Sequence, residues 1–111
     1  MRALDLPLII EIADLVRLIP NEKLLIIAVC QRDVFETQHI PNSVLIEPAE
    51  LVGGVKPSTG KLPDSQKLKQ VFSRVGLQQK RHVIAYDDEG GGWAGRLIWT
   101  LDVLGHQNYS F

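Results

Sequence analysis

Acids and glycines stand side by side in one short stretch of this chain, and these residues are the best placed to do chemistry. In chain order, the stretch and its flank contain Asp87, Asp88, Glu89, Gly90, Gly91, Gly92, Trp93 and Arg96. Adjacent carboxylates at a strand end can bind a hard divalent cation. Acids beside a helix N-terminus can instead cap the helix, which gains about 0.3–1 kcal/mol from each. We favour capping, and we expect neither a metal ion nor another cofactor.

The chain has one cysteine, Cys30, directly after the apolar run Leu24–Val29. A helix N-terminus at this point could lower the pKa of the thiol and make it a nucleophile. Because free cysteines are commonly buried, we predict an inert, mostly buried residue instead. A single cysteine also excludes an internal disulfide and a multi-cysteine zinc site, and it suits a reducing compartment.

Arg96 is the cation nearest to the acidic stretch, one turn into the helix that is expected from Trp93. We predict that it pairs with Asp87 or a neighbouring acid and holds the loop shut. A residual anion site or a contact with a second domain is the alternative. Trp93 and Trp99 must face different directions on that helix, so one of them is a candidate for an interdomain surface, although core packing is favoured for both.

His39 ends a short predicted helix just before Pro41. A metal-binding or acid–base role would need a second ligand nearby, and the sequence offers none. We therefore predict a structural role in the turn. His82 and His106 belong to no recognisable pattern.

Strands that alternate with helices position these residues. The predicted strands are 8–10, 24–29, 44–46, 83–86 and 108–111, and the predicted helical segments are 12–19, 32–38, 47–51, 65–75 and 93–104. Trp93, Leu97, Leu101 and Leu104 share one face of the last helix, which should end at Gly105. This alternation predicts an α/β fold with a parallel sheet, right-handed crossovers and helices on both faces.

The bulk composition limits the possible functions. The chain has 111 residues, 45% of them hydrophobic, and a net charge of −1. It is long enough for one domain over residues 1–111 with its own core. No basic stripe indicates nucleic-acid binding, and the apolar run near the N-terminus is too short to cross a membrane. A cytoplasmic protein is the expectation.

Three segments of the sequence resemble the rhodanese (sulfurtransferase) domain. They are QHIPNSVLI at 38–46, GKLPDSQKLKQVFSRVGL at 60–77 and YDDEGGGWAGRLIWTLDVLGH at 86–106. The resemblance implies a three-layer sandwich with a five-stranded parallel sheet flanked by helices. It also implies transfer of sulfane sulfur from thiosulfate or a mercapto acid to a thiophilic acceptor. The last segment is most similar to the N-terminal domain of tandem-domain bacterial rhodaneses.

The chain departs from the family at the residues that carry the chemistry. Catalytic members have a persulfide cysteine in a Cys-x-x-Gly-x-Arg loop, whereas this chain has Asp87 at the cysteine position, Gly90 at the glycine and Gly92 at the arginine. A carboxylate cannot carry a persulfide, and the adjacent acids repel anionic donors.

The resemblance therefore implies a catalytically inactive domain, whose partner is a catalytic rhodanese domain or a second protein chain. A free-standing regulatory or protein-binding module is the alternative, and an enzyme that uses Cys30 or the carboxylates is a third. The family also implies that the chain is cut short within its last strand, as in a fragment or an interrupted gene product.

Overall fold

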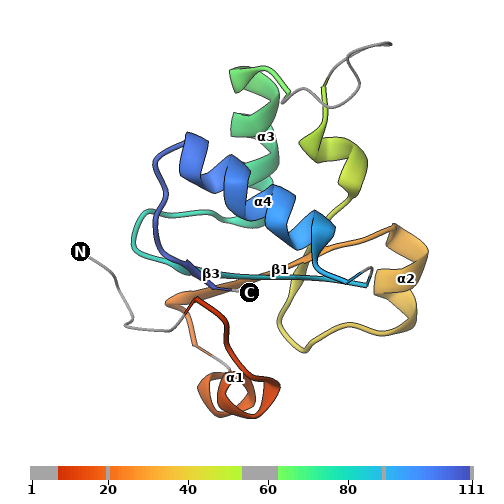
Figure 1. Cartoon of the computed structure of the whole chain (residues 1–111), viewed down its shortest axis with the longest axis vertical. Helices are drawn as coiled ribbons and strands as arrows, with labels where there is room; N and C mark the ends of the chain where they lie inside the picture. Colours follow the sequence, from red (N-terminus) through yellow and green to blue (C-terminus); the bar gives the residue numbers. More distant parts are fainter. Residues whose placement is uncertain (1–7, 20, 54–62, 89, 111) are drawn as a thin grey trace.

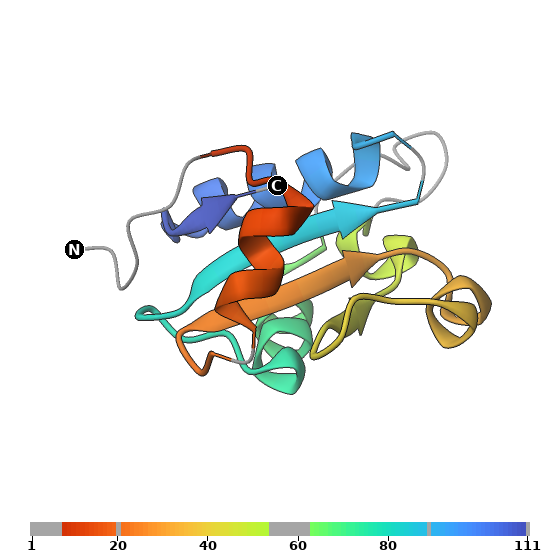
Figure 2. The same cartoon turned by 90° about the horizontal axis from the view of Figure 1, so that it is seen from below.

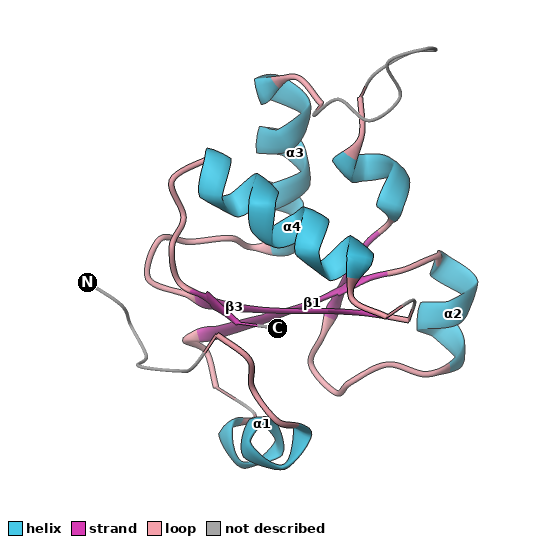
Figure 3. Cartoon of the chain, in the orientation of Figure 1, coloured by secondary structure: helices cyan, strands magenta, loops and turns pink. Residues whose placement is uncertain are grey.

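In the described part of the chain, four parallel strands form the sheet that supports the other elements. The computed structural model describes residues 8–19, 21–53, 63–88 and 90–110. Within these ranges the strand order is β2-β1-β3-β4. The strands are β1 (Leu24–Val29), β2 (Val44–Ile46), β3 (His82–Asp87) and β4 (Tyr109–Ser110). All the pairings are parallel, as the alternation of strands and helices predicts, and Figure 3 shows the sheet edge-on between the helices.

Strand β1 is central because it is apolar along its whole length. All six residues of its sequence LLIIAV are buried, as expected for a parallel strand with both faces covered. It pairs with β3 over its whole length, from Leu24 opposite His82 to Val29 opposite Asp87. This register places the ends of the two strands side by side.

Helices cover both faces of the sheet (Figures 1 and 2). Helix α1 (Ile12–Leu18) lies on one face, and α3 (Ser65–Val75) and α4 (Gly92–Val103) lie on the other, beside the 3-10 turn η1 (Pro48–Leu51). Helix α2 (Arg32–Thr37) lies beyond the carboxyl ends of β1 and β3. The larger core lies under α3 and α4, and a smaller one, which contains Leu15, lies under α1. The predicted layer arrangement is confirmed.

The expected fifth strand at residues 8–10 is wrong. This segment forms a bend, and the side chains of Leu8 and Ile9 are 54% and 68% exposed. Ile10 packs against the α1 side of the core, so part of the segment's hydrophobicity serves helix contacts and not a sheet ladder. The glycines and Pro57 of residues 53–61 also predict a surface loop, but 54–61 lie outside the described residues.

Helix α3 begins and ends at the residues that the sequence predicts. The carboxylate of Asp64 accepts a hydrogen bond from Lys67 N at 2.8 Å, which caps the N-terminus. Gly76 ends the helix with φ +85°, and Leu77 N donates back to Phe72 O at 2.9 Å. This left-handed turn is the arrangement in which glycine is favoured.

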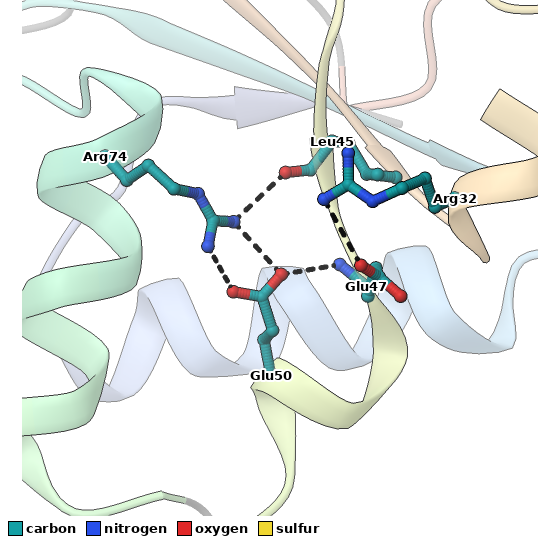
Figure 4. A network of polar contacts seen from close by, with 5 residues as sticks. All are labelled: Arg32, Leu45, Glu47, Glu50 and Arg74. Atoms are coloured by element: carbon teal, nitrogen blue, oxygen red, sulfur yellow. Dashed lines mark hydrogen bonds and ion pairs between the residues drawn. The ribbon is translucent and has the colours of Figure 1, made fainter. Parts of the chain in front are cut away.

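A polar network ties α3 to β2, η1 and α2 (Figure 4). The carboxylate of Glu50 accepts hydrogen bonds from the guanidinium of Arg74 and from the backbone N–H of Glu47. Arg74 also donates to Leu45 O at 3.2 Å, and Arg32 pairs with Glu47 at 3.4 Å. Partial burial raises the pKa of Glu50, but the hydrogen bond from Arg74, the one from Glu47 and the nearby positive charges outweigh burial and lower it.

A matched pair of glycine substitutions tests the two backbone conformations. Gly76→Ala should destabilise the fold by about 1 kcal/mol, because φ is positive and the new Cβ would lie 3.2 Å from Arg81 Nη1. Gly95→Ala, inside α4 with open space around the added methyl, should stabilise it by about 0.5–1 kcal/mol. Urea unfolding measures both, and equal effects of the two substitutions would contradict the assignment.

Glu50→Gln tests the polar network through its pH dependence. The pKa of Glu50 is lower in the folded chain than the ordinary value of 4.5, so its contribution is fully present above that pH and is lost as pH falls through the folded pKa. We expect the variant to be about 1 kcal/mol less stable at neutral pH and close to the parent at an acidic pH below the folded pKa of Glu50. Urea unfolding at both pH values measures this, with exposed Glu36→Gln as control. The same difference at both pH values would refute it.

Candidate functional site

The carboxyl edge of the sheet brings two chain segments together. Strand β1 leads into Cys30, and β3 leads through Asp87 into Asp88. Because Val29 is opposite Asp87 in the ladder, Cys30 and the acidic stretch follow neighbouring strand ends. The carboxyl edge of a parallel sheet is where α/β proteins place their binding and catalytic groups.

Asp87 caps the helix that follows it. One carboxylate oxygen accepts a hydrogen bond from Gly91 N at 2.8 Å, and the other accepts one from Ala94 N at 2.7 Å. Gly90 and Gly91 have φ of +83° and +101°, so the chain curls back over the carboxylate in a conformation that few other residues adopt. The structure thus supports capping by Asp87, the interpretation that the sequence favours.

Asp88 is exposed, and Glu89 lies outside the described residues. Within the ranges that the structure covers, no three His, Cys, Asp or Glu side chains are gathered as metal ligands would be.

Arg96 does not pair with Asp87, so that prediction is wrong. Its Nε and Nη2 donate to Leu51 O at 3.1 and 3.0 Å, and its guanidinium carbon lies 4.9 Å from the ring centroid of Trp99. The carboxylate of Asp87 is already held by backbone N–H groups at the helix end, whereas Arg96 projects from the side of the helix towards η1. The guanidinium thus links α4 to η1. The loop before α4 is held by the hydrogen bonds between Asp87 and backbone N–H groups instead.

The two tryptophans separate as their spacing requires. Trp93 is partly buried and packs against the larger core, whereas Trp99 is 48% exposed. Core packing for both is therefore wrong. Leu97 and Leu101 are fully buried as predicted, but Leu104 is 46% exposed because it lies just past the helix end at Val103.

Cys30 is buried, as predicted, and its thiol is protonated at neutral pH. Burial raises its pKa above the ordinary value of 9.0. Four carboxylates raise the pKa further, namely Asp88, Asp33, Asp87 and Glu47. The pKa is thus raised, first by burial and then by these carboxylates, so the alternative of a pKa lowered by a helix N-terminus is wrong.

An open groove of about 690 Å³ lies between α2 and the end of β3. Its lining residues are Asp33, Val34, Thr37, Gln38, His39, Ile40, Pro41, Tyr86 and Asp88. The phenol oxygen of Tyr86 holds one wall in place, since it accepts a hydrogen bond from Ile40 N and forms another with Ser43 Oγ, both at 3.0 Å. Sequence reasoning missed this groove, because the only signal was a tyrosine one residue before the acids.

The three histidines have structural contacts. His39 Nδ1 lies 2.7 Å from Phe35 O and its ring stacks on Phe35, which supports the predicted role in the turn. His82 is fully buried with Nε2 2.7 Å from Ser110 Oγ, and His106 Nε2 lies within 3.2 Å of two backbone oxygens. The last two help to attach β4 to the sheet.

None of the helices in the described ranges is both long and apolar enough to cross a lipid bilayer.

Comparison with known sequences identifies the family of the chain. The sequence model of the rhodanese-like domain family matches residues 11–111. Thiosulfate sulfurtransferases from Pseudomonas aeruginosa and Azotobacter vinelandii are each 37% identical to the chain over 107 residues, which are 96% of the chain. The chain spans only 40% of the length of either relative.

Solved structures support the same fold. The sub-stoichiometric sulfur transferase subunit of yeast mitochondrial complex I superposes with a TM-score of 0.76 at 21% identity, covering 93% of this chain and 37% of that one. SseA from Escherichia coli, a 3-mercaptopyruvate sulfotransferase, superposes with a TM-score of 0.75 at 19% identity, covering 92% of this chain and 39% of that one. Together with the match over residues 11–111, these similarities establish that the chain belongs to the rhodanese-like domain family.

Proposed function

We propose that this domain is the catalytically inactive part of a sulfurtransferase, and that it packs against a catalytic rhodanese domain and helps to shape the cleft. One observation carries the proposal: the carboxylate of Asp87 accepts hydrogen bonds from Gly91 N and Ala94 N. Asp87 stands where the family resemblance places the persulfide cysteine. The loop between β3 and α4 therefore folds around the carboxylate of one of its own residues.

The chemistry of sulfur transfer fails at this loop for three reasons. A carboxylate is a poor nucleophile towards sulfur and cannot hold a persulfide. The N–H groups of Gly91 and Ala94, which would stabilise a bound anion, are already used by Asp87. Gly92 supplies no cation at the position where catalytic members have arginine.

Electrostatic repulsion acts against anionic sulfur donors as well. Asp88 is exposed next to Asp87, so an approaching thiosulfate meets like charge. Two like charges about 4 Å apart repel by about 1 kcal/mol in water and several times more at low dielectric. The protonated, buried thiol of Cys30 is no substitute nucleophile, since the thiolate is the reactive form.

The relatives support a partner domain. The two bacterial thiosulfate sulfurtransferases are longer than this chain, which covers 40% of each. We propose that the natural partner is a catalytic rhodanese domain, in the same polypeptide or in a second chain. A single cysteine that stays reduced fits a cytoplasmic location.

The second candidate is a free-standing module that recognises a protein partner without supporting catalysis. The groove beside Asp88 favours it, because this surface is open and largely apolar. A catalytic rhodanese domain added in trans separates the two: it should bind the chain and gain sulfurtransferase activity under the first proposal, and do neither under the second.

Asp87→Cys tests whether the missing thiol is the only defect. We expect cyanide-dependent thiocyanate production from thiosulfate to stay at background, because the acidic neighbour and the absent cation still disfavour the donor. The double variant Asp87→Cys with Gly92→Arg should gain activity, and it is sterically permitted since an added Cβ at Gly92 meets nothing within 4 Å. Cys30→Ser in each background excludes the buried thiol. Robust turnover by Asp87→Cys alone would show that loop and charge are already competent.

Asp87→Ala tests the capping role by stability. Loss of both carboxylate hydrogen bonds should destabilise the fold by about 1–2 kcal/mol, and Asp87→Asn should cost less because one acceptor oxygen remains. Exposed Asp88→Ala is the matched control and should change stability by less than about 0.5 kcal/mol. Chemical unfolding measures all three variants. If Asp87→Ala is as stable as the control, the carboxylate does not hold the helix.

A further inference from the structure

Helix α2 is the least buried helix of the described chain. None of its six residues is buried, Val34 is 36% exposed, and Phe35 is only partly buried. A six-residue helix is not stable alone in water. The stack of Phe35 on His39 and the pair of Arg32 with Glu47 help to hold it in place. Its groove side thus presents apolar surface that the fold does not use.

The groove beside α2 has the size of a binding site. Its volume of about 690 Å³ lies within the usual range of protein pockets, roughly 300–1,000 Å³. Val34, Ile40, Pro41 and Tyr86 contribute apolar side chains to its lining, which is largely apolar. The hydrogen bonds of the Tyr86 hydroxyl with Ile40 N and Ser43 Oγ fix the wall opposite α2, so the groove is preformed.

The charge of the groove has one sign. Asp33 lines it from α2 and Asp88 from the end of β3, and no lysine or arginine is among its lining residues. The ion pairs within the part of the chain that the structure describes are Arg32 with Glu47 and Arg74 with Glu50. Neither Asp33 nor Asp88 therefore has a basic partner there.

The other acids of this edge are already engaged. Asp87 binds the N-terminal N–H groups of α4, and Glu47 pairs with Arg32. The field of Asp33 and Asp88 extends to the buried thiol of Cys30, whose pKa these carboxylates raise after the larger effect of burial. The apolar side chains of the groove lie beside two carboxylates that have no basic partner in the described chain. Such a surface is complementary to a cation that has an aliphatic group next to it.

We propose that the groove between α2 and the end of β3 binds a segment of a partner protein in which a basic side chain is flanked by aliphatic ones. The guanidinium or ammonium group lies at Asp33 and Asp88, and the aliphatic side chains pack on Val34 and Ile40. Acidic segments are excluded by the same carboxylates. This inference goes beyond the proposed function, because it concerns the groove and not the Asp87 loop, and it holds for a catalytic domain or any other protein partner.

Titration of the isotope-labelled chain with the peptide acetyl-Leu-Arg-Leu-amide tests the proposal by NMR. We expect amide shifts in α2, at 38–41 and at Asp88, with a dissociation constant in the millimolar range and binding that weakens as salt is added. The charge-reversed acetyl-Leu-Glu-Leu-amide and methylguanidinium should both bind more weakly.

Asp33→Asn with Asp88→Asn should weaken binding of the arginine peptide by about fivefold, since two exposed charge pairs are lost. Glu36→Gln removes the same charge from α2 outside the groove lining and should leave the affinity within about twofold. The amide spectrum of each free variant reports whether it is folded, and the two single substitutions replace the double variant if it is not.

Equal binding of the arginine and glutamate peptides would overturn the proposal, as would shifts confined to the face of α4 around Trp99. If methylguanidinium and the arginine peptide bound with equal affinity, the role of the apolar side chains that line the groove would be overturned. If the Asp33 and Asp88 variants kept full affinity for the arginine peptide, the role of the two carboxylates would be overturned. None of these results bears on the proposed catalytic silence, which the Asp87 variants test separately.

Discussion

The hydrogen bonds from the first turn of α4 to the Asp87 carboxylate determine the conformation of the carboxyl edge of the sheet. Two N–H groups converge on one side chain, and this requires the left-handed glycines before the helix and the β1–β3 register behind it. Helix α4 then places Leu97 and Leu101 on the sheet and Arg96 against the carbonyl of Leu51. The negative group that this helix end favours is part of the chain itself.

The acids of this edge divide into two kinds with different consequences. Asp87 and Glu47 are compensated by hydrogen bonds or by a basic partner, so they stabilise the fold. Asp33 and Asp88 face the groove without a basic partner in the described chain, so their charge is directed towards whatever binds there. Sulfur transfer needs the opposite arrangement, an electropositive loop around an anion. This contrast is the basis of the two proposals, that the loop is catalytically silent and that the groove binds a cation.

The sequence predicts correctly those features that depend on residues close together in the chain. The continuous apolar run of β1 and the helical segment 65–75 are both correct, because each depends on neighbours in the chain. Residues 8–10 failed because a short apolar run fits a helix contact as well as a strand. The partner of Arg96 and the groove at Tyr86 depend on segments more than forty residues apart, and one sequence has no signal for such pairs.

The position of Cys30 has a consequence for oxidative damage. Susceptibility of a thiol to peroxide follows its exposure and its thiolate character, and Cys30 has little of either. An enzyme that cycles through a persulfide must keep a reactive sulfur atom accessible, and oxidants reach it there. Because its one thiol is buried and has a raised pKa, this domain should resist oxidation by peroxide better than a domain whose reactive sulfur atom is exposed.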